Sequence, residues 1–404
     1  MIIIIDHYSQ APGEKGNNRF LFIADMLCTQ GHEVEIVTSN FSHIRKKHRK
    51  IENSELQKLK YKYTMLHEPG YKKNISLTRI YSHFIFGENL KKYLSLRENV
   101  ECIYISVPSL DVGKVAANYS KTKGIPFIVD IQDIWPEAFE LVLPLKSITK
   151  YLLVPLYFMA NHIYRSADYI FAVSETYLQR GLRVKSSARG SYVYLGTDLD
   201  LFDNAVKESN IYKNDDEIWI VYVGTLGASY NIELVINAIK ALFKLGRLNI
   251  RLKILGDGPD LNYLKSISRN TPVDFLGRLD YKEMVGYLAK CDIAVNVIVK
   301  NAAQSIINKH ADYAAAGLPI ISTQESSEYK NLLKKYNCGI NCEVDDINSF
   351  IKAIEFLIDN SVVRIEMGSN SRKMAEELFN RRNTNKEIID IVERIIKNEN
   401  NNIW

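Results

Sequence analysis

Apolar runs of strand length alternate along the chain with segments whose apolar residues recur at helical spacing. Runs that are apolar at every position are typical of parallel strands whose sheet is covered by helices on both faces. In the first half of the chain, strands are predicted at 2–5, 33–38, 102–107, 127–131, 169–173 and 192–195. Residues 42–100 are less regular and are expected to form helices and loops over one edge of this sheet.

A second series of alternating elements begins at residue 217, after a polar stretch at 204–216 that is predicted as a linker. Its strands are predicted at 218–223, 251–255, 273–276, 293–298 and 319–322, and its helices near 231–245, 259–269, 281–290 and 308–316. The pattern predicts an α/β protein of two doubly wound, Rossmann-like parallel-sheet domains that face each other across a cleft. We expect the domains at 1–203 and 204–383, with a C-terminal helix at about 384–404 that packs back onto the first.

The positive net charge is concentrated in one region. Residues 41–100 contain 14 Lys and Arg against 5 Asp and Glu, a local excess of +9 in a chain whose net charge is +5. Such a segment attracts a phosphate-rich surface such as anionic lipid, although a solvated helix or loop face has the same composition. Nucleic acid is not an expected partner, because no aromatic interleaving or known motif accompanies the basic run.

The sequence predicts a cytoplasmic protein. The apolar N-terminus lacks the basic start and the cleavage site of a secretion signal. The longest apolar stretch, 151–160, has about half the length that a membrane-spanning helix needs. The five cysteines are mostly far apart and are expected to be buried, reduced thiols.

Glycine turns follow several of the predicted strands and are candidates for binding a nucleotide donor. Glycine allows a ligand to approach the backbone, and the helix that follows offers unpaired amides to an anion. Each glycine alone is also common in any tight turn. The candidates are Gly16 and Arg19 in the first domain, and Gly224, Thr225, Gly256 and Arg278 in the second.

The segment 130–137 (DIQDIWPE) directly follows a predicted strand of the first domain. Asp133 could orient or deprotonate an acceptor hydroxyl, and Trp135 could pack against a sugar ring. Asp130 and Glu137 are the further acceptor-binding candidates. The alternative is a rigid turn in which an aspartate acts only as a cap.

The segment 304–319 (QSIINKHADYAAAGLP) offers the most informative chemistry. Backbone amides at the start of its helix would favour a diphosphate, and a lysine adds a positive charge beside them. An aspartate one turn later could accept hydrogen bonds from ribose hydroxyls. The candidates are Gln304, Ser305, Ile306, Asn308, Lys309 and Asp312, of which Gln304 and Lys309 are, with Asp133, the predicted catalytic residues.

These motifs, in this order, resemble the family 4 (group 1) glycosyltransferases of the GT-B fold. The usual late signature of that family is Glu-x7-Glu followed by Ala-Met-Ala-x-Gly-x-Pro; here Gln304 and Asp312 hold the spacing and residues 313–319 follow. The variant of this motif and the Asp-x-Trp-Pro-Glu turn at 133–137 are similar to the bacterial capsule, O-antigen and exopolysaccharide subgroup. Segments 31–39, 174–182 and 195–202 also match, so the resemblance covers essentially the whole chain.

The resemblance implies transfer of a hexosyl or N-acetylhexosaminyl group from a nucleotide sugar, expected to be UDP-linked, with retention at the anomeric carbon. No metal or other cofactor is expected. The implied acceptor is a lipid-linked saccharide of surface-polysaccharide biosynthesis, at the anionic inner face of the cell membrane, where the protein would be peripheral. The basic segment 41–100 and the apolar stretch 151–160 agree with that location.

Several departures from the family pattern concern the donor. The first glutamate is Gln304, and the second is the shorter Asp312. The Arg and Lys that many members carry after the first strand of the second domain fall at Thr225 and Tyr230, so the diphosphate must be neutralised by Lys309, Arg278 or Arg19. A sugar-nucleotide epimerase of similar fold and a catalytically inactive binding subunit remain alternative functions.

Overall fold

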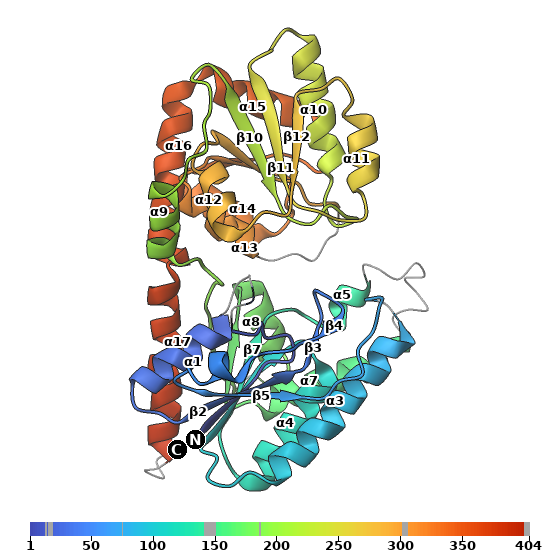
Figure 1. Cartoon of the computed structure of the whole chain (residues 1–404), viewed down its shortest axis with the longest axis vertical. Helices are drawn as coiled ribbons and strands as arrows, with labels where there is room; N and C mark the ends of the chain where they lie inside the picture. Colours follow the sequence, from blue (N-terminus) through green and yellow to red (C-terminus); the bar gives the residue numbers. More distant parts are fainter. Residues whose placement is uncertain are drawn as a thin grey trace. The chain divides into compact units, whose positions relative to one another are not determined.

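The computed structural model describes residues 1–12, 14, 19–74, 76–140, 151–185, 187–300 and 306–399 (Figure 1). The chain forms two compact units: unit 1 comprises Met1–Tyr194 with Asn385–Trp404, and unit 2 comprises Leu195–Thr384. The boundary expected between 203 and 204 falls inside helix α9 (Leu199–Lys207). Because α9 packs against α12 (Tyr281–Leu288), the second unit begins earlier than the sequence pattern indicates.

Unit 1 contains a parallel sheet of seven strands in the order β5-β2-β1-β6-β7-β8-β9. The strands are β1 (Ile2–Ile5), β2 (Val34–Ser39), β5 (Lys62–Leu66), β6 (Cys102–Val107), β7 (Phe127–Ile131), β8 (Tyr169–Ala172) and β9 (Arg189–Tyr192). A hairpin of β3 (Phe41–Ser42) and β4 (Lys47–His48) forms a separate two-stranded sheet.

The central strands of unit 1 confirm the sequence prediction, and the differences lie at the two edges. The prediction for 42–100 misses β5, because its partly exposed residues do not form a continuous apolar run. The strand predicted at 192–195 is wrong: β9 covers Arg189–Tyr192, and the apolar Val193 and Tyr194 are buried beyond its end. An edge strand is not covered on both sides, so its sequence need not be apolar.

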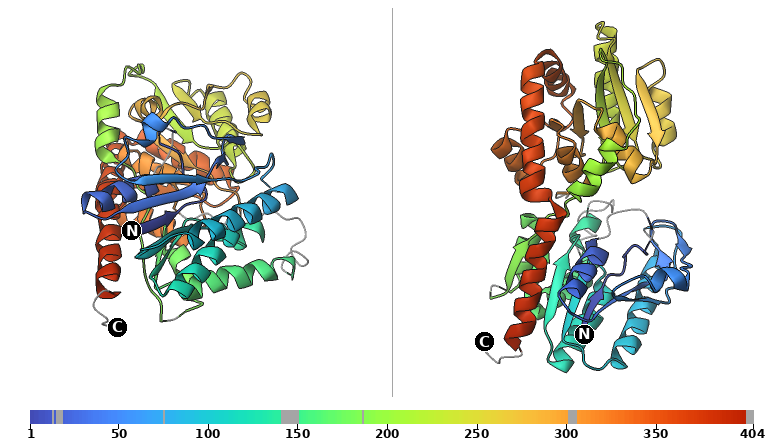
Figure 2. Two further views of the ribbon diagram at one scale, coloured as in Figure 1. Left: turned by 60° about the horizontal axis from the view of Figure 1, so that its bottom comes forward. Right: turned by 60° about the vertical axis from the view of Figure 1, so that its left-hand side comes forward.

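The two faces of the unit 1 sheet are covered by different helices. α1 (Arg19–Thr29) and the part of α17 (Arg381–Glu399) that belongs to unit 1 lie side by side on one face (Figure 2). A buried cluster joins Ile2 and Ile4 of β1 to Ile23 of α1 and Val392 of α17. On the other face, α4 (Leu110–Lys123) packs between α3 (Leu77–Ser95) and α7 (Val154–Ser166), and α8 (Glu175–Leu182) packs beside α7. Two short helices, α2 (Asn53–Leu56) and α5 (Glu137–Glu140), complete the described part of this unit.

Unit 2 contains a parallel sheet of six strands in the order β12-β11-β10-β13-β14-β15. The strands are β10 (Ile218–Val223), β11 (Ile250–Leu255), β12 (Val273–Gly277), β13 (Ile293–Asn296), β14 (Ile320–Ser322) and β15 (Gly339–Asn341). The first five confirm the predicted strands to within two residues at either end. The prediction misses β15, an edge strand of three residues that has no apolar run.

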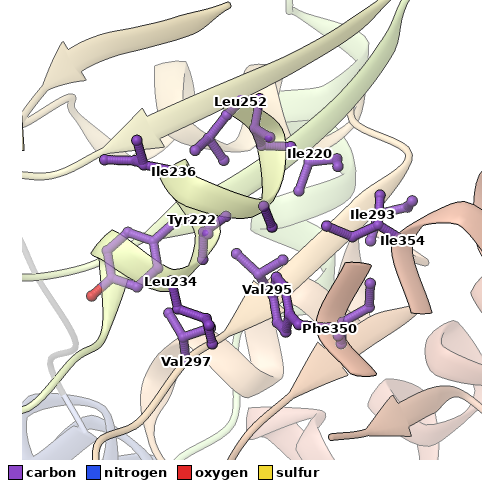
Figure 3. Packing of buried hydrophobic residues seen from close by; sticks show 14 of the residues in the cluster. Ile220, Tyr222, Leu234, Ile236, Leu252, Ile293, Val295, Val297, Phe350 and Ile354 are labelled. Carbon is purple, nitrogen blue, oxygen red and sulfur yellow. The ribbon is translucent and has the colours of Figure 1, made fainter. Parts of the chain in front are cut away.

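The core of unit 2 lies mainly between its sheet and three helices, α10 (Ile232–Lys244), α11 (Leu261–Ile267) and α15 (Ile347–Asp359). Figure 3 shows Ile220 and Tyr222 of β10 packed with Val295 of β13 and Phe350 of α15. The remaining elements of this unit include α9, α12, α13 (Asn308–Ala315), α14 (Ser327–Tyr336), α16 (Ser361–Met374) and the π-helix Ala375–Phe379. Helix α16 packs against both α13 and α14.

Both sheets reverse their strand order beside their first strand, between β1 and β6 in unit 1 and between β10 and β13 in unit 2. In doubly wound sheets, ligands bind outside the carboxyl ends of the strands at this point. The predicted fold class of two doubly wound parallel-sheet domains is therefore confirmed. None of the described helices has both the length and the apolar composition that crossing a bilayer requires.

Candidate functional site

The carboxyl ends of β10 and β11 meet backbone to backbone. Gly224, directly after β10, has a φ of +144°. A Cβ atom on Gly256, directly after β11, would lie 1.8 Å from the carbonyl oxygen of Gly224, and one on Gly258 would lie 2.2 Å from that of Leu226. Gly256 and Gly258 therefore have no space for a side chain.

Lys309 lies in the first turn of α13 and points its ammonium group toward this turn. A Cβ atom on Gly224 would lie 3.3 Å from its Nζ atom. The Nζ atom is 4.4 Å from the ring centre of Tyr222 and 3.9 Å from that of Tyr230. The lysine is 6% exposed, and among the described residues Nζ has no hydrogen-bond partner.

Two aromatic rings only partly replace the water that Lys309 loses on burial. Burial lowers the pKa of Lys309 to about 7. Contact with an aromatic face stabilises a desolvated cation by about 2 kcal/mol, whereas a buried polar group without a hydrogen bond is costly. The site would therefore gain from an anionic ligand that accepts hydrogen bonds from Nζ.

The other polar residues of α13 have partners within unit 2. The Tyr281 hydroxyl donates to Asp312 at 3.3 Å and lies 2.6 Å from the hydroxyl of Thr197. Burial raises the pKa of Asp312 to about 6. Asp312 was predicted to bind ribose, but the structure engages its carboxyl group with protein hydroxyls, so it is not a free acceptor.

His310 and Tyr313, which flank Asp312 in α13, hold this helix in place. His310 stacks on Tyr329 at 3.8 Å between ring centres, and its Nδ1 accepts a hydrogen bond from the Ile307 amide at 3.2 Å. The Tyr313 hydroxyl accepts a hydrogen bond from the Val223 amide at 2.7 Å. Because Val223 is the last residue of β10, Tyr313 connects the start of the Gly224 turn directly to α13.

The remaining donor candidates differ in placement. Gly16, Gln304 and Ser305 lie outside the described residues. Thr225, Arg278 and Asn308 are exposed, and Ile306 is buried. Arg278 follows β12, an edge strand that is separated from β10 by β11. In the order of the sheet it is therefore one strand further from the Gly224 turn than the turn after β11 is.

Arg19, a predicted donor residue, is instead part of a buried ion pair in unit 1. It is 2% exposed, and its guanidinium donates to Asp130 at 3.1 Å and to the carbonyl of Val193 at 3.1 Å. Asp130 also accepts hydrogen bonds from the hydroxyl of Tyr104 at 2.7 Å and from the side-chain amide of Gln132 at 2.6 Å. Both predictions need correction, because buried groups that form an ion pair with each other are not accessible to a diphosphate or an acceptor.

The turn after β7 agrees in part with its alternative interpretation as a rigid turn. Asp133 accepts hydrogen bonds from the Ile134 amide at 2.9 Å and the Trp135 indole at 3.2 Å, and burial raises its pKa. Glu137 forms an ion pair with Arg180. Asp133 therefore has local partners, which limits it as a group that positions an acceptor.

Trp135 differs from its neighbours because it borders a pocket of about 430 Å³ in unit 1. The pocket lies among α3, α4, α7 and the turn after β7. The indole of Trp135 stacks on His83 with 6.2 Å between the ring centres, and the guanidinium of Arg79 lies 4.7 Å from the centre of the Trp135 ring. The contact of Trp135 with an acceptor stays a prediction, and the residue lies beside a cavity.

Sequence reasoning missed a buried network at the point where the unit 1 sheet reverses its order. His7, after β1, lies 2.6 Å from the hydroxyl of Ser109, after β6, and 2.9 Å from Glu68. Burial acts to raise the pKa of Glu68, but hydrogen bonds from His7, Ser39 and Ser82 lower it to about 2. A histidine directly after the first strand was the available signal.

Among the described residues, one group has ligand atoms that lie close enough together to hold a metal ion. It consists of His7, Glu68 and His83, whose ligand atoms lie within 4.8 Å of one another. These atoms already have hydrogen-bond partners. His7 bonds Glu68, and the Nε2 atom of His83 accepts a hydrogen bond from Arg79 at 3.4 Å. A cation such as Arg79 beside the group disfavours a second cation.

The second unit also carries a match to a known family. Residues 217–360 match the model of the glycosyl transferases group 1. An uncharacterized glycosyltransferase from Methanocaldococcus jannaschii is 24% identical over 246 residues, which are 58% of this chain and 60% of that relative. The match therefore spans less than two thirds of the relative's length.

Solved structures match nearly the whole chain. Sucrose-phosphate synthase from Thermosynechococcus elongatus matches 98% of this chain and 99% of its own, with a TM-score of 0.75 and 16% identity. The Anabaena protein HepE, solved in complex with UDP, matches 97% of this chain and 99% of its own, with a TM-score of 0.68 and 14% identity. At these identities the similarity shows the fold alone.

Proposed function

We propose that the chain, whose residues 217–360 match the model of the glycosyl transferases group 1 and which has the GT-B fold, transfers a sugar from a nucleotide sugar to a saccharide acceptor. In this reaction the bond between the anomeric carbon and the donor phosphate breaks, and a bond to an acceptor oxygen forms. The proton of the acceptor hydroxyl leaves with the donor phosphate, so no protein nucleophile is required.

The observation that carries this proposal is the buried ammonium group of Lys309. It lies beside the Gly224 turn, where the fold places ligands, and it has no hydrogen-bond acceptor among the described residues. Many members of the family that the sequence resembles carry an Arg and a Lys in this turn, at the positions of Thr225 and Tyr230 here. Lys309 lies over the ring of Tyr230, so it supplies from α13 a positive charge that the turn itself lacks.

Lys309 would act on the diphosphate of the donor. Negative charge develops on the leaving diphosphate as the anomeric bond breaks, and a fixed cation in a dry site stabilises that charge strongly. The nearby anion would in turn raise the pKa of Lys309 from about 7, so that the bound lysine is protonated at neutral pH.

We also propose the finer features that the sequence motifs imply. These are the family 4 type of reaction, with retention at the anomeric carbon and without a metal, a UDP-linked hexose or N-acetylhexosamine as donor, and a lipid-linked acceptor of surface-polysaccharide biosynthesis at a membrane. The UDP complex of the Anabaena structure supports the choice of nucleotide. The basic segment 41–100 supports an anionic membrane surface.

The proposal is tested by incubating the purified protein with UDP-glucose and UDP-N-acetylglucosamine, with and without lipid-linked acceptors. We expect a sugar-dependent release of UDP that Lys309→Met abolishes and that Lys240→Met, at an exposed position of α10, leaves unchanged. Interconversion of sugars without UDP release would identify an epimerase. Binding of UDP-sugars without turnover under any acceptor would identify an inactive binding subunit.

A further inference from the structure

Two cations in unit 1 lie close to each other, and neither forms an ion pair with a carboxylate among the described residues. Lys46 donates a hydrogen bond to the side chain of Asn74, and Arg79 donates one to the carbonyl of the same residue at 2.8 Å. Both approach the ring of Tyr71, at 4.5 Å for Lys46 and 5.4 Å for Arg79. Among the described residues, the other groups that they contact, His43, His83, Tyr8 and Trp135, are neutral.

The pKa values of His43 and Lys46 reflect the same positive charge, which the Glu68 carboxylate offsets only in part. Burial, together with the charges of Lys46 and Arg79, lowers the pKa of His43 to about 4. Burial and the charge of Arg79 also lower the pKa of Lys46. Like charges that lie together in a protein and form no ion pair with a carboxylate indicate a place for an anionic ligand.

The cation pair adjoins the pocket of about 430 Å³. Asn74 and Arg79 are among the residues that line it. Most of the remaining lining is apolar: Leu77, Ile80, Leu110, Trp135, Leu153 and Leu156. The pocket therefore combines a cationic end with apolar walls, which fits a ligand with an anionic head and an apolar chain.

Exposed apolar side chains continue the apolar wall outward. On α3, Leu77, Ile80 and Phe84 follow one another at helical spacing and are 84%, 64% and 52% exposed. Contiguous exposed apolar residues mark interaction sites in monomeric proteins. An apolar chain that leaves the pocket would therefore stay in contact with apolar surface.

We propose that Lys46 and Arg79 bind the phosphate or diphosphate group of a lipid, and that the adjoining pocket holds the first part of its apolar chain. This inference rests on the proposed function, because the lipid is the carrier of the saccharide acceptor. The N-terminus of α3, whose cap residue Ser76 also lines the pocket, favours the same negative charge. The described residues that line the pocket also include a carboxylate, that of Asp111 in the first turn of α4.

Isothermal titration calorimetry with farnesyl diphosphate below its micellar concentration tests the proposal directly. Inorganic diphosphate supplies the head without the chain, and farnesol supplies the chain without the head. We expect farnesyl diphosphate to bind at least tenfold more tightly than either. Equal binding of farnesol would remove the role of the cations, and equal binding of inorganic diphosphate would remove the role of the pocket.

Variants locate the binding. Lys46→Met and Arg79→Met should each weaken farnesyl diphosphate binding at least tenfold, and Lys72→Met, at an exposed lysine of the same basic segment, should not. Ile80→Glu places a negative charge beside the pocket without disturbing the core and should also weaken binding. Its control is Ile365→Glu, at a position of α16 that is 70% exposed. Unchanged binding by Lys46→Met and Ile80→Glu would overturn the proposal even if Arg79→Met failed to fold.

Vesicles that contain 30% phosphatidylglycerol distinguish a carrier lipid from the bulk membrane. If the protein bound these vesicles through Lys46 and Arg79 but did not bind farnesyl diphosphate in solution, the cations would be a headgroup contact and the proposal would be wrong. UDP-glucose affinity, measured on the same variants, should not change. If the unmodified protein did not bind UDP-glucose, the proposed function would be contradicted. The lipid result would then be judged separately.

Discussion

Arg19 in unit 1 and Lys309 in unit 2 are both buried cations in the first turn of a helix, and both were candidates for neutralising a donor diphosphate. The structure separates them by what surrounds the charge. Arg19 has a carboxylate and backbone carbonyls as partners, whereas Lys309 has two tyrosine rings and no hydrogen-bond partner among the described residues. A buried cation that forms an ion pair stabilises a scaffold, whereas a buried cation without any hydrogen-bond acceptor indicates a ligand.

The largest expected effect is on the stability of unit 1 in Arg19→Met. Removing one partner leaves Asp130 as an uncompensated buried charge, which costs about 3–5 kcal/mol. Hydrogen–deuterium exchange of β1 and β7 should show this loss as faster opening. Adding Asp130→Asn should recover part of the stability; equal stability of the unmodified protein and Arg19→Met would show that the pair is not structural.

Lys309→Met should weaken the binding of UDP-glucose without weakening unit 2. Truncating one member of a buried charge pair costs about 2 kcal/mol or more, which is roughly a 30-fold loss of affinity. Titration calorimetry measures this directly. Lys240→Met is the matched control, and an affinity of Lys309→Met within twofold of the unmodified protein would contradict the proposed role.

The affinity for UDP-glucose should also depend on pH. The pKa of Lys309 is about 7 in the free protein and is raised by the bound diphosphate. Above pH 7 the free lysine is increasingly neutral, so binding must take up a proton and the affinity falls by up to about tenfold per pH unit. UDP-glucose suits this measurement because its phosphates do not titrate in this range. A profile of Lys309→Met as steep as that of the unmodified protein would exclude Lys309 as the titrating group.

The smallest expected effect is a gain in stability from Lys309→Met. Below pH 7 the lysine is protonated in the folded and the unfolded state, and the folded state bears the full desolvation cost; an apolar replacement then gains about 1–2 kcal/mol. Between pH 7 and 10 the unfolded state binds more protons, so the unmodified protein becomes relatively more stable and the gain shrinks. Exchange protection of β10 at pH 6 and pH 9 measures both values. If the gain in stability increased with pH, burial of the protonated lysine would not be what destabilises the folded protein.

The parts of the fold that the sequence predicts are those where burial is uniform. Strands β1, β6, β7 and β10 are apolar at nearly every position, because helices cover the sheet on both sides there. The edge strands β5, β9 and β15 carry no such run, and their existence depends on one neighbouring strand. Pairing with a neighbour is a long-range property that a local pattern does not encode.

The candidate site shows the same division. Glycine turns after strands and a lysine at the start of a helix can be recognised locally, and Gly224, Gly256 and Lys309 do lie together in the structure. The partners of charged residues cannot be recognised in this way. Asp130 is 111 positions from Arg19 in the chain, and Glu68 is 61 positions from His7.

The sequence by itself determined the two doubly wound sheets, the order of their central strands along the chain and the turns where a ligand would meet the backbone. Only the tertiary structure decided which charges are satisfied, because the free energy of a buried charge depends on the few atoms that surround it. Packing therefore assigned Arg19 to the scaffold of unit 1 and left the ammonium group of Lys309 without a hydrogen-bond partner among the described residues. It also brought Lys46 and Arg79 together beside an apolar pocket.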